Sequence, residues 1–112
     1  MRIQVRYNGI EVSPTLRRHI EKHVRFALGR FRPHVPRVLV LLSRAPGRQM
    51  HDKECSILME TVGQHPVAVR QIESDIFAAV TRAAQRAGRA LGRRMSIDDC
   101  AAVRSIEYKR TP

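Results

Sequence analysis

Acidic residues are scarce in this sequence of 112 residues. Ten Asp and Glu stand against twenty-one Lys and Arg, which leaves a net charge of +11. Tryptophan is absent, and there are only two Tyr and three Phe. Two cysteines without a CxxC spacing provide no disulfide framework, so a reducing, cytoplasmic setting is the simplest expectation.

Long apolar stretches are also missing. No apolar run reaches the length of about 18 residues that suggests a membrane span, so we expect no membrane-spanning helix. The N-terminus alternates polar and apolar residues and therefore lacks the apolar core of a signal peptide. The basic excess predicts a polyanionic partner, nucleic acid before an anionic membrane surface.

The apolar periodicity predicts a single α+β domain. Strands are expected over residues 2–7, 36–43, 54–61 and 66–71, and helices over 14–31 and 73–95. Ser13 and Pro14 form a typical helix start. The apolar run 38–42 predicts a strand more buried than the first. The order β-α-β-β-β-α predicts a four-stranded sheet with two helices on one face, with these residues buried between them: Leu16, Ile20, Val24, Ile76, Val80 and Ala83.

Residues 96–112 are expected to be a separate C-terminal tail. The second helix is predicted to end after Met95, and Ser96 is interpreted as the beginning of a turn. The apolar content of this segment is too low to offset the entropy of ordering, about 1–2 kcal/mol per residue. We therefore predict a domain over residues 1–95 followed by a largely mobile tail.

Basic residues recur with helical spacing in both predicted helices. In the second helix the spacings are 4, 3 and 4, with no acidic residue between Ile76 and Ile97; in the first they are 4 and 3. Such spacing places each set on one helix face, so two adjacent helices would present both rows on a common surface. The pattern predicts contacts to RNA phosphates, with solvated helix faces as the alternative. The residues are Arg18, Lys22, Arg25, Arg82, Arg86, Arg89 and Arg93.

The three phenylalanines are expected to pack in the core or at the edge of a groove, with the core favoured. Phe26, Phe31 and Phe77 all fall in helical segments, and no paired aromatic surface of the kind that stacks RNA bases is visible. Base stacking is therefore expected to matter less than phosphate contact.

Candidate catalytic and metal-binding groups are few. His19 and His23 share a helix face, but the HxExH spacing differs from HExxH, and no third ligand is indicated. Cys55 lies in an apolar strand pattern, where a thiol is usually inert, although His51 is nearby in sequence. GxSxG, GxGxxG and GxxxxGK[ST] motifs are all absent. We expect a protein without enzymatic activity, metal or cofactor.

Two segments resemble a known family. Residues 9–17 (GIEVSPTLR) with 19–22 (HIEK), and residues 73–80 (ESDIFAAV), are similar to the ribosome hibernation promoting factor family. This family is also called ribosome-associated inhibitor A or sigma-54 modulation protein. The resemblance extends from residue 1 to about 95. Thr81 stands where the family often has an aspartate, and we expect a short form without the C-terminal dimerisation domain of the long form.

The resemblance implies a fold like that of a double-stranded-RNA-binding domain. The implied partners are the small ribosomal subunit and its ribosomal RNA, contacted in the decoding channel where tRNA and mRNA normally bind. The protein would be a short form, monomeric in solution. The positions that match the family's basic residues are Arg18, Lys22, Arg25, Arg82, Arg86 and Arg89.

Three hypotheses follow from the sequence. The first is a cytoplasmic ribosome-associated translation inhibitor, or hibernation factor, that blocks tRNA and mRNA by occupying the decoding channel. The alternative is a general double-stranded-RNA or ribosome-assembly binding module. The third is a small enzyme that uses the His19 and His23 face or Cys55.

Overall fold

The computed structural model describes the backbone of residues 1–45 and 52–110 and the side chains up to residue 95. Four strands and two long helices follow the predicted order, with a short 3-10 helix, η1, after the first long helix. Within the described ranges, no helix combines the length and hydropathy that a membrane span requires. The elements are β1 (Arg2–Asn8), α1 (Pro14–Leu28), η1 (Gly29–His34), β2 (Arg37–Arg44), β3 (Lys53–Glu60), β4 (Val67–Glu73) and α2 (Ile76–Arg110).

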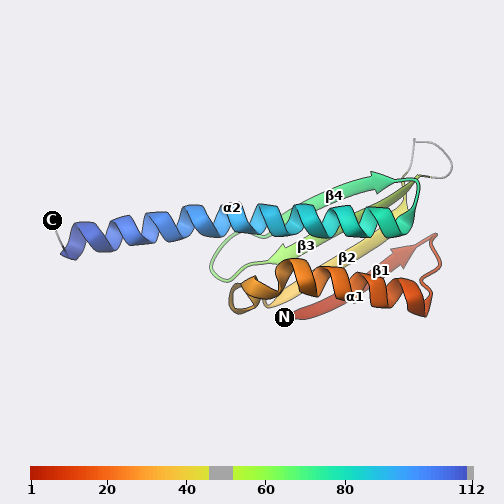
Figure 1. The fold of residues 1–112 in the computed structure, drawn as a ribbon, viewed down its shortest axis with the longest axis horizontal. Coiled ribbons are helices and arrows are strands. Elements are labelled where there is room, and N and C mark those ends of the chain that lie inside the picture. The colour runs from red at the N-terminus through yellow and green to blue at the C-terminus, as the bar shows by residue number, and fades with distance from the viewer. Residues whose placement is uncertain (46–51, 111–112) are drawn as a thin grey trace.

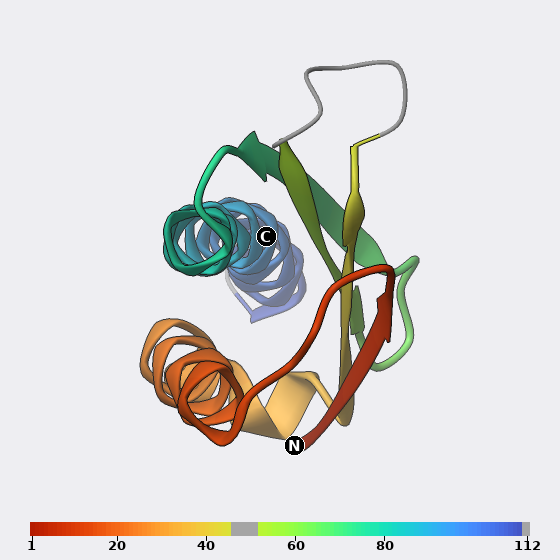
Figure 2. The same ribbon diagram turned by 90° about the vertical axis from the view of Figure 1, so that its right-hand side faces the viewer.

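The four strands form one mixed sheet in the order β1-β2-β3-β4. β1 pairs with β2 in parallel, which requires a crossover connection, and α1 provides it. The other two pairings are antiparallel. Both helices cover the same face of the sheet (Figure 2), and they run side by side in the same direction (Figure 1). The predicted α+β architecture is confirmed.

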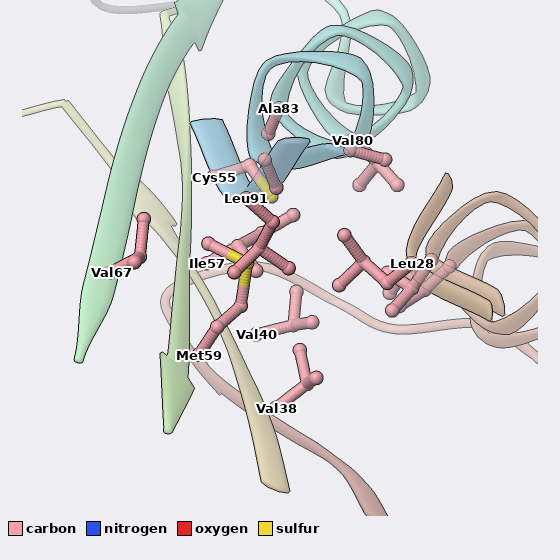
Figure 3. Packing of buried hydrophobic residues seen from close by; sticks show 14 of the residues in the cluster. Leu28, Val38, Val40, Cys55, Ile57, Met59, Val67, Val80, Ala83 and Leu91 are labelled. Atoms are coloured by element: carbon pink, nitrogen blue, oxygen red, sulfur yellow. The ribbon is translucent and has the colours of Figure 1, made fainter. Parts of the chain in front are cut away.

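The core lies between the helices and the covered face of the sheet (Figure 3). Val40 is in register with Val5 on one side and Ile57 on the other, which gives an apolar row across three strands. Among the residues predicted to be buried, Ile76 is only half-buried. The other predicted core residues are buried: Leu16, Ile20, Val24, Val80 and Ala83.

The apolar run of β2 is buried on one face only. Val38, Val40 and Leu42 are buried, whereas Leu39 is half-buried and Leu41 is 38% exposed. The reason is the single helical layer, which leaves the opposite face of the sheet open (Figure 2). An unbroken apolar run normally indicates a strand covered on both faces, so the pattern of β2 overstates its burial.

The first helix ends earlier than predicted. Ser13 caps its start, with its hydroxyl accepting from the Leu16 amide at 3.1 Å, but the α-helix stops at Leu28 and tightens into η1. Pro33 explains the change, because a proline has no amide hydrogen and its ring clashes with the carbonyl four residues earlier in an α-helix. Phe31, in η1, still reaches the core.

The predicted bounds of the second helix are wrong at both ends. Residues 72 and 73 pair with β3 and extend β4 beyond its predicted end at residue 71. α2 therefore begins at Ile76, after Asp75 caps the Phe77 amide at 3.2 Å. At the other end α2 continues beyond Met95 to Arg110 and projects past the sheet (Figure 1). No proline occurs between residues 67 and 111, so no residue there prevents a helix from continuing. The tail mobility expected for residues 96–112 stays a prediction, and residues 111 and 112 lie outside the described part.

Candidate nucleic-acid interface

Three basic residues of α1 point away from the sheet. Arg18, Lys22 and Arg25 are exposed, and each lies roughly 140–160° around the helix from buried Ile20. In the part of the chain that the structure describes, none of them makes a hydrogen bond or an ion pair. Their charges are therefore available to a ligand.

The first two arginines of the α2 row fold over β4. Arg82 Nη1 is 2.7 Å from Glu73 Oε1, and Arg86 Nη1 donates to the Arg70 carbonyl and to Gln71 Oε1. A hydrogen bond from the Gln71 amide, followed by the contact with Arg82, holds the pKa of Glu73 below its ordinary value. Arg82 and Arg86 thus tie α2 to the sheet edge, which weakens the case for them as free phosphate-binding groups.

The last two arginines of the row differ from the first two in having no partner among the described residues. Arg89 and Arg93 are exposed, and neither forms a hydrogen bond or ion pair with a described residue. Each lies roughly 160° around α2 from a buried residue two positions earlier, Ala87 or Leu91. They therefore point away from the sheet, as the α1 residues do. We call the combined set the outer basic surface: Arg18, Lys22, Arg25, Arg89 and Arg93.

The seam between the helices is not where the basic rows meet. A hollow of about 300 Å³ lies there, and apart from Lys22 its lining is mainly apolar or neutral. Of the basic rows only Lys22 reaches this hollow, because other residues make the contact between α1 and α2. The hollow is lined by Lys22, His23, Phe26, Ala27, Thr81, Ala84 and Gln85.

Phe26 contradicts the interpretation of the phenylalanines as core residues. Phe31 is buried and Phe77 is half-buried, but Phe26 is 91% exposed at the mouth of the hollow. The sequence contains a signal for this position: Phe26 lies roughly 120° around the helix from Ile20, outside the buried stripe of α1. That a Phe lies in a helix does not show which face of the helix it occupies. Its spacing from the buried residues does.

His19 and His23 lie against each other on the α2 side of α1. Their ring centroids are 4.2 Å apart. His19 Nε2 is 3.1 Å from the Phe77 carbonyl and 2.9 Å from Thr81 Oγ1. A carbonyl oxygen only accepts hydrogen bonds, so Nε2 carries the proton and is not open to a metal. Thr81 also donates to the same carbonyl, and its hydroxyl thus joins the two helices.

The second histidine of the pair favours its neutral form. Burial lowers the pKa of His23, and the neighbouring His19 and Lys22 lower it further. In the described ranges, no three His, Cys, Asp or Glu side chains gather in a way that could hold a metal ion.

Cys55 is an inert thiol in the core. It is fully buried in β3, and burial raises its pKa to about 12, with a smaller contribution from Glu54. A thiol with this pKa carries almost no thiolate at neutral pH, and the thiolate is the nucleophilic form. His51 lies outside the described residues. The structure thus disfavours a catalytic role for Cys55.

Known proteins share this fold and sequence pattern. A family model described as Sigma 54 modulation protein / S30EA ribosomal protein matches residues 3–96. A ribosomal subunit interface protein from Coxiella burnetii is similar in structure, with a TM-score of 0.72 and 17% identity over 86% of this chain and 99% of that one. The Protein Y N-terminal domain of Thermus thermophilus has a TM-score of 0.64 and 23% identity, over 83% and 98% of the two chains. No curated protein sequence matches the chain.

Proposed function

This chain belongs to the Sigma 54 modulation protein / S30EA ribosomal protein family, and from that membership we propose that it binds ribosomes and keeps them translationally inactive. The more specific proposal is that it binds ribosomal RNA of the small subunit in the decoding channel and excludes tRNA and mRNA. The outer basic surface is the observation that carries this proposal, because its five cations point outward and make no ion pair within the described residues.

The mechanism is electrostatic and steric. Each guanidinium that reaches a phosphate releases condensed counterions, which favours association and makes it dependent on salt. Arginine suits this task because its planar group matches the geometry of phosphate oxygens. The folded body then occupies the space that tRNA and mRNA need. No covalent chemistry is required, and the protein acts as a cytoplasmic monomer without cofactor in this proposal.

Co-sedimentation with isolated small subunits tests the proposal directly. We expect the protein to sediment with the subunit and to compete with tRNA for it. If all five cations of the outer basic surface contact phosphates, the slope of log affinity against log salt should be about −3.5 to −4.5, at ~0.7–0.9 per contact. Binding that does not change with salt would refute the electrostatic mechanism.

A pair of matched variants locates the contact. Arg25→Gln with Arg89→Gln removes two charges from the outer basic surface and should make the slope shallower by about 1.4–1.8. Arg2→Gln with Arg6→Gln removes the same charge from exposed positions of β1, which alternate with core-facing Ile3 and so lie on the open sheet face. This control should leave the slope almost unchanged. Equal effects of the two pairs would mean that binding has no preferred face.

Competition distinguishes the alternative function. A general double-stranded-RNA or ribosome-assembly module would bind an unrelated RNA duplex as tightly as the subunit. Such a module would not be displaced selectively by tRNA. Selective displacement favours the decoding channel as the site.

A further inference from the structure

We propose that the hollow between α1 and α2 binds an unpaired RNA base, which stacks on Phe26. This inference rests on the proposed RNA-binding function and adds a second mode of contact to the phosphate contacts of the outer basic surface. Its starting point is the position of Phe26 at the mouth of a hollow of about 300 Å³, with 91% of the residue exposed.

A phenylalanine that is this exposed buries little apolar surface, so it contributes little to the stability of the fold. Phe31 belongs to the hydrophobic core and Phe77 packs against it, whereas nearly all of the surface of Phe26 is exposed to water. Among the large hydrophobic residues of the described chain, Phe26 is the most exposed, and Val62 follows at 64%. Phe26 is therefore free to contact a ligand without any rearrangement of the core.

The lining of the hollow suits a flat heteroaromatic ring. Ala27 and Ala84 provide small apolar side chains from the two facing helices, which leaves space for a ring beside Phe26. The exposed Gln85 offers one amide that both donates and accepts, the combination needed for the edge of a base. The hollow lies near the lower end of the volumes of small-ligand sites, roughly 300–1,000 Å³.

The charges around the hollow select the class of ligand. Lys22 lines it together with Phe26, so a cation lies beside the aromatic platform. Cations that hold phosphates beside an aromatic face that stacks a base are the general means of binding single-stranded nucleic acid. Duplex RNA presents no free base face, so the expected partner is a loop, bulge or strand end. A neutral His23, whose pKa burial lowers, adds no charge inside the hollow at neutral pH.

A single tryptophan reports stacking directly. The chain contains no Trp, so Phe26→Trp introduces the only one, at a position so exposed that folding should not change. We expect a single-stranded RNA octanucleotide to quench its fluorescence, and a blunt duplex of the same sequence to quench it much less. A tryptophan signal that single strands leave unchanged overturns the proposal.

Affinity provides the second measurement. Phe26→Ala should weaken binding of the octanucleotide roughly 5- to 150-fold, the equivalent of one lost base stack. The salt slope should stay the same, because no phosphate contact is removed. Tyr7→Ala, which removes an exposed aromatic of β1, should leave both quantities unchanged. Equal losses from Phe26→Ala and Tyr7→Ala would overturn the proposal.

The outcome separates this inference from the proposed function. If the protein binds small subunits but Phe26→Ala leaves octanucleotide affinity intact, the stacking site is refuted and the phosphate surface stands. If Phe26→Ala weakens subunit binding but not octanucleotide binding, Phe26 does not stack on an unpaired base of a single strand, and the proposal is wrong. If the octanucleotide stacks on the Phe26→Trp variant while small subunits are not bound, the stacking site stands and the ribosomal function fails.

Discussion

Two glycines in α2 should respond oppositely to the same substitution. Gly88 and Gly92 lie one turn apart within the helix, and glycine in a helix interior costs about 1 kcal/mol relative to alanine. From the sequence both glycines look like equal defects. The structure distinguishes them, because only Gly88 lies where α2 approaches the backbone of α1 closely.

The spatial limits at the two positions differ in kind. A Cβ at Gly88 would lie 3.0 Å from the Ala27 carbonyl oxygen and 3.5 Å from the Ala27 Cβ, so α1 itself has to move. A Cβ at Gly92 would lie 3.2 Å from Arg30 Nη2, the end of a flexible exposed side chain that can rotate away. An added methyl group thus meets backbone at Gly88 and the end of a mobile side chain at Gly92.

The magnitudes follow from these contacts. Gly92→Ala should increase the free energy of unfolding by about 0.5–1 kcal/mol, most of the helix propensity difference. Overpacking a well-packed contact typically costs about 1–3 kcal/mol, which exceeds that gain for Gly88→Ala. We expect Gly88→Ala to be destabilising by up to about 2 kcal/mol.

Urea denaturation of the full chain measures the difference. The midpoint of the Gly92→Ala variant should rise and that of the Gly88→Ala variant should fall, with unchanged m values. In thermal melts 1 kcal/mol corresponds to roughly 4–8 °C in a domain of this size. Equal stabilisation by both substitutions would show that the helices separate freely at Ala27, and the close approach would then have no energetic significance.

Three further predictions concern charged and buried groups. Arg82→Glu should lower the urea midpoint below that of Arg82→Gln, because it places a second carboxylate beside Glu73, whose pKa is lowered by its present partners; equal midpoints would contradict the ion pair. The pKa of His23 is lowered chiefly by burial, so the unfolded state takes up a proton at a higher pH than the folded state does. The contribution of neutral His23 to stability is therefore complete above about pH 6.5 and declines below it. His23→Gln should flatten that decline in pH-dependent melts. With Cys100→Ser removing the other thiol, Cys55, whose pKa is raised to about 12, should react with iodoacetamide at pH 8 only as fast as the protein unfolds, and rapid labelling of the native protein would contradict its burial.

The sensitivity of Arg82 corrects an expectation from the sequence. Helical spacing alone places Arg82 and Arg89 on the polar face of α2, which predicts that charge reversal at both positions leaves stability almost unchanged. Arg89 still fits that expectation, since it forms no hydrogen bond or ion pair with a described residue. Arg82 does not, because Glu73 at the end of β4 lies 2.7 Å from it. A helical spacing identifies a face but not the neighbour beside it.

Local patterns in the sequence were sufficient for the architecture. Alternation indicated the first strand and an apolar run indicated the second. The four-residue spacing of Leu16, Ile20 and Val24 indicated the buried face of α1, and Ser13 with Pro14 indicated its start. These features depend on residues close together in the chain, so they can be read without knowledge of the fold. The high net charge, a sum over all residues, was equally independent of the fold.

Element ends and the true neighbours of each side chain depended on tertiary structure. The end of β4 and the start of α2 were set by pairing with β3, and the single helical layer left Leu41 partly exposed on the open face of the sheet. The packing of α1 beside α2 also decided that Phe26 is exposed to solvent, at the mouth of the hollow between the helices.

The division of the α2 arginines shows the distinction most clearly. The sequence determined that four arginines share one face of α2, because helical geometry alone fixes the angle between them. Only the tertiary structure decided that Arg82 and Arg86 reach β4 while Arg89 and Arg93 find no described partner. The physical reason is that an ion pair or hydrogen bond requires two groups within a few ångströms, and here the partners belong to a strand whose position beside the helix is set by core packing.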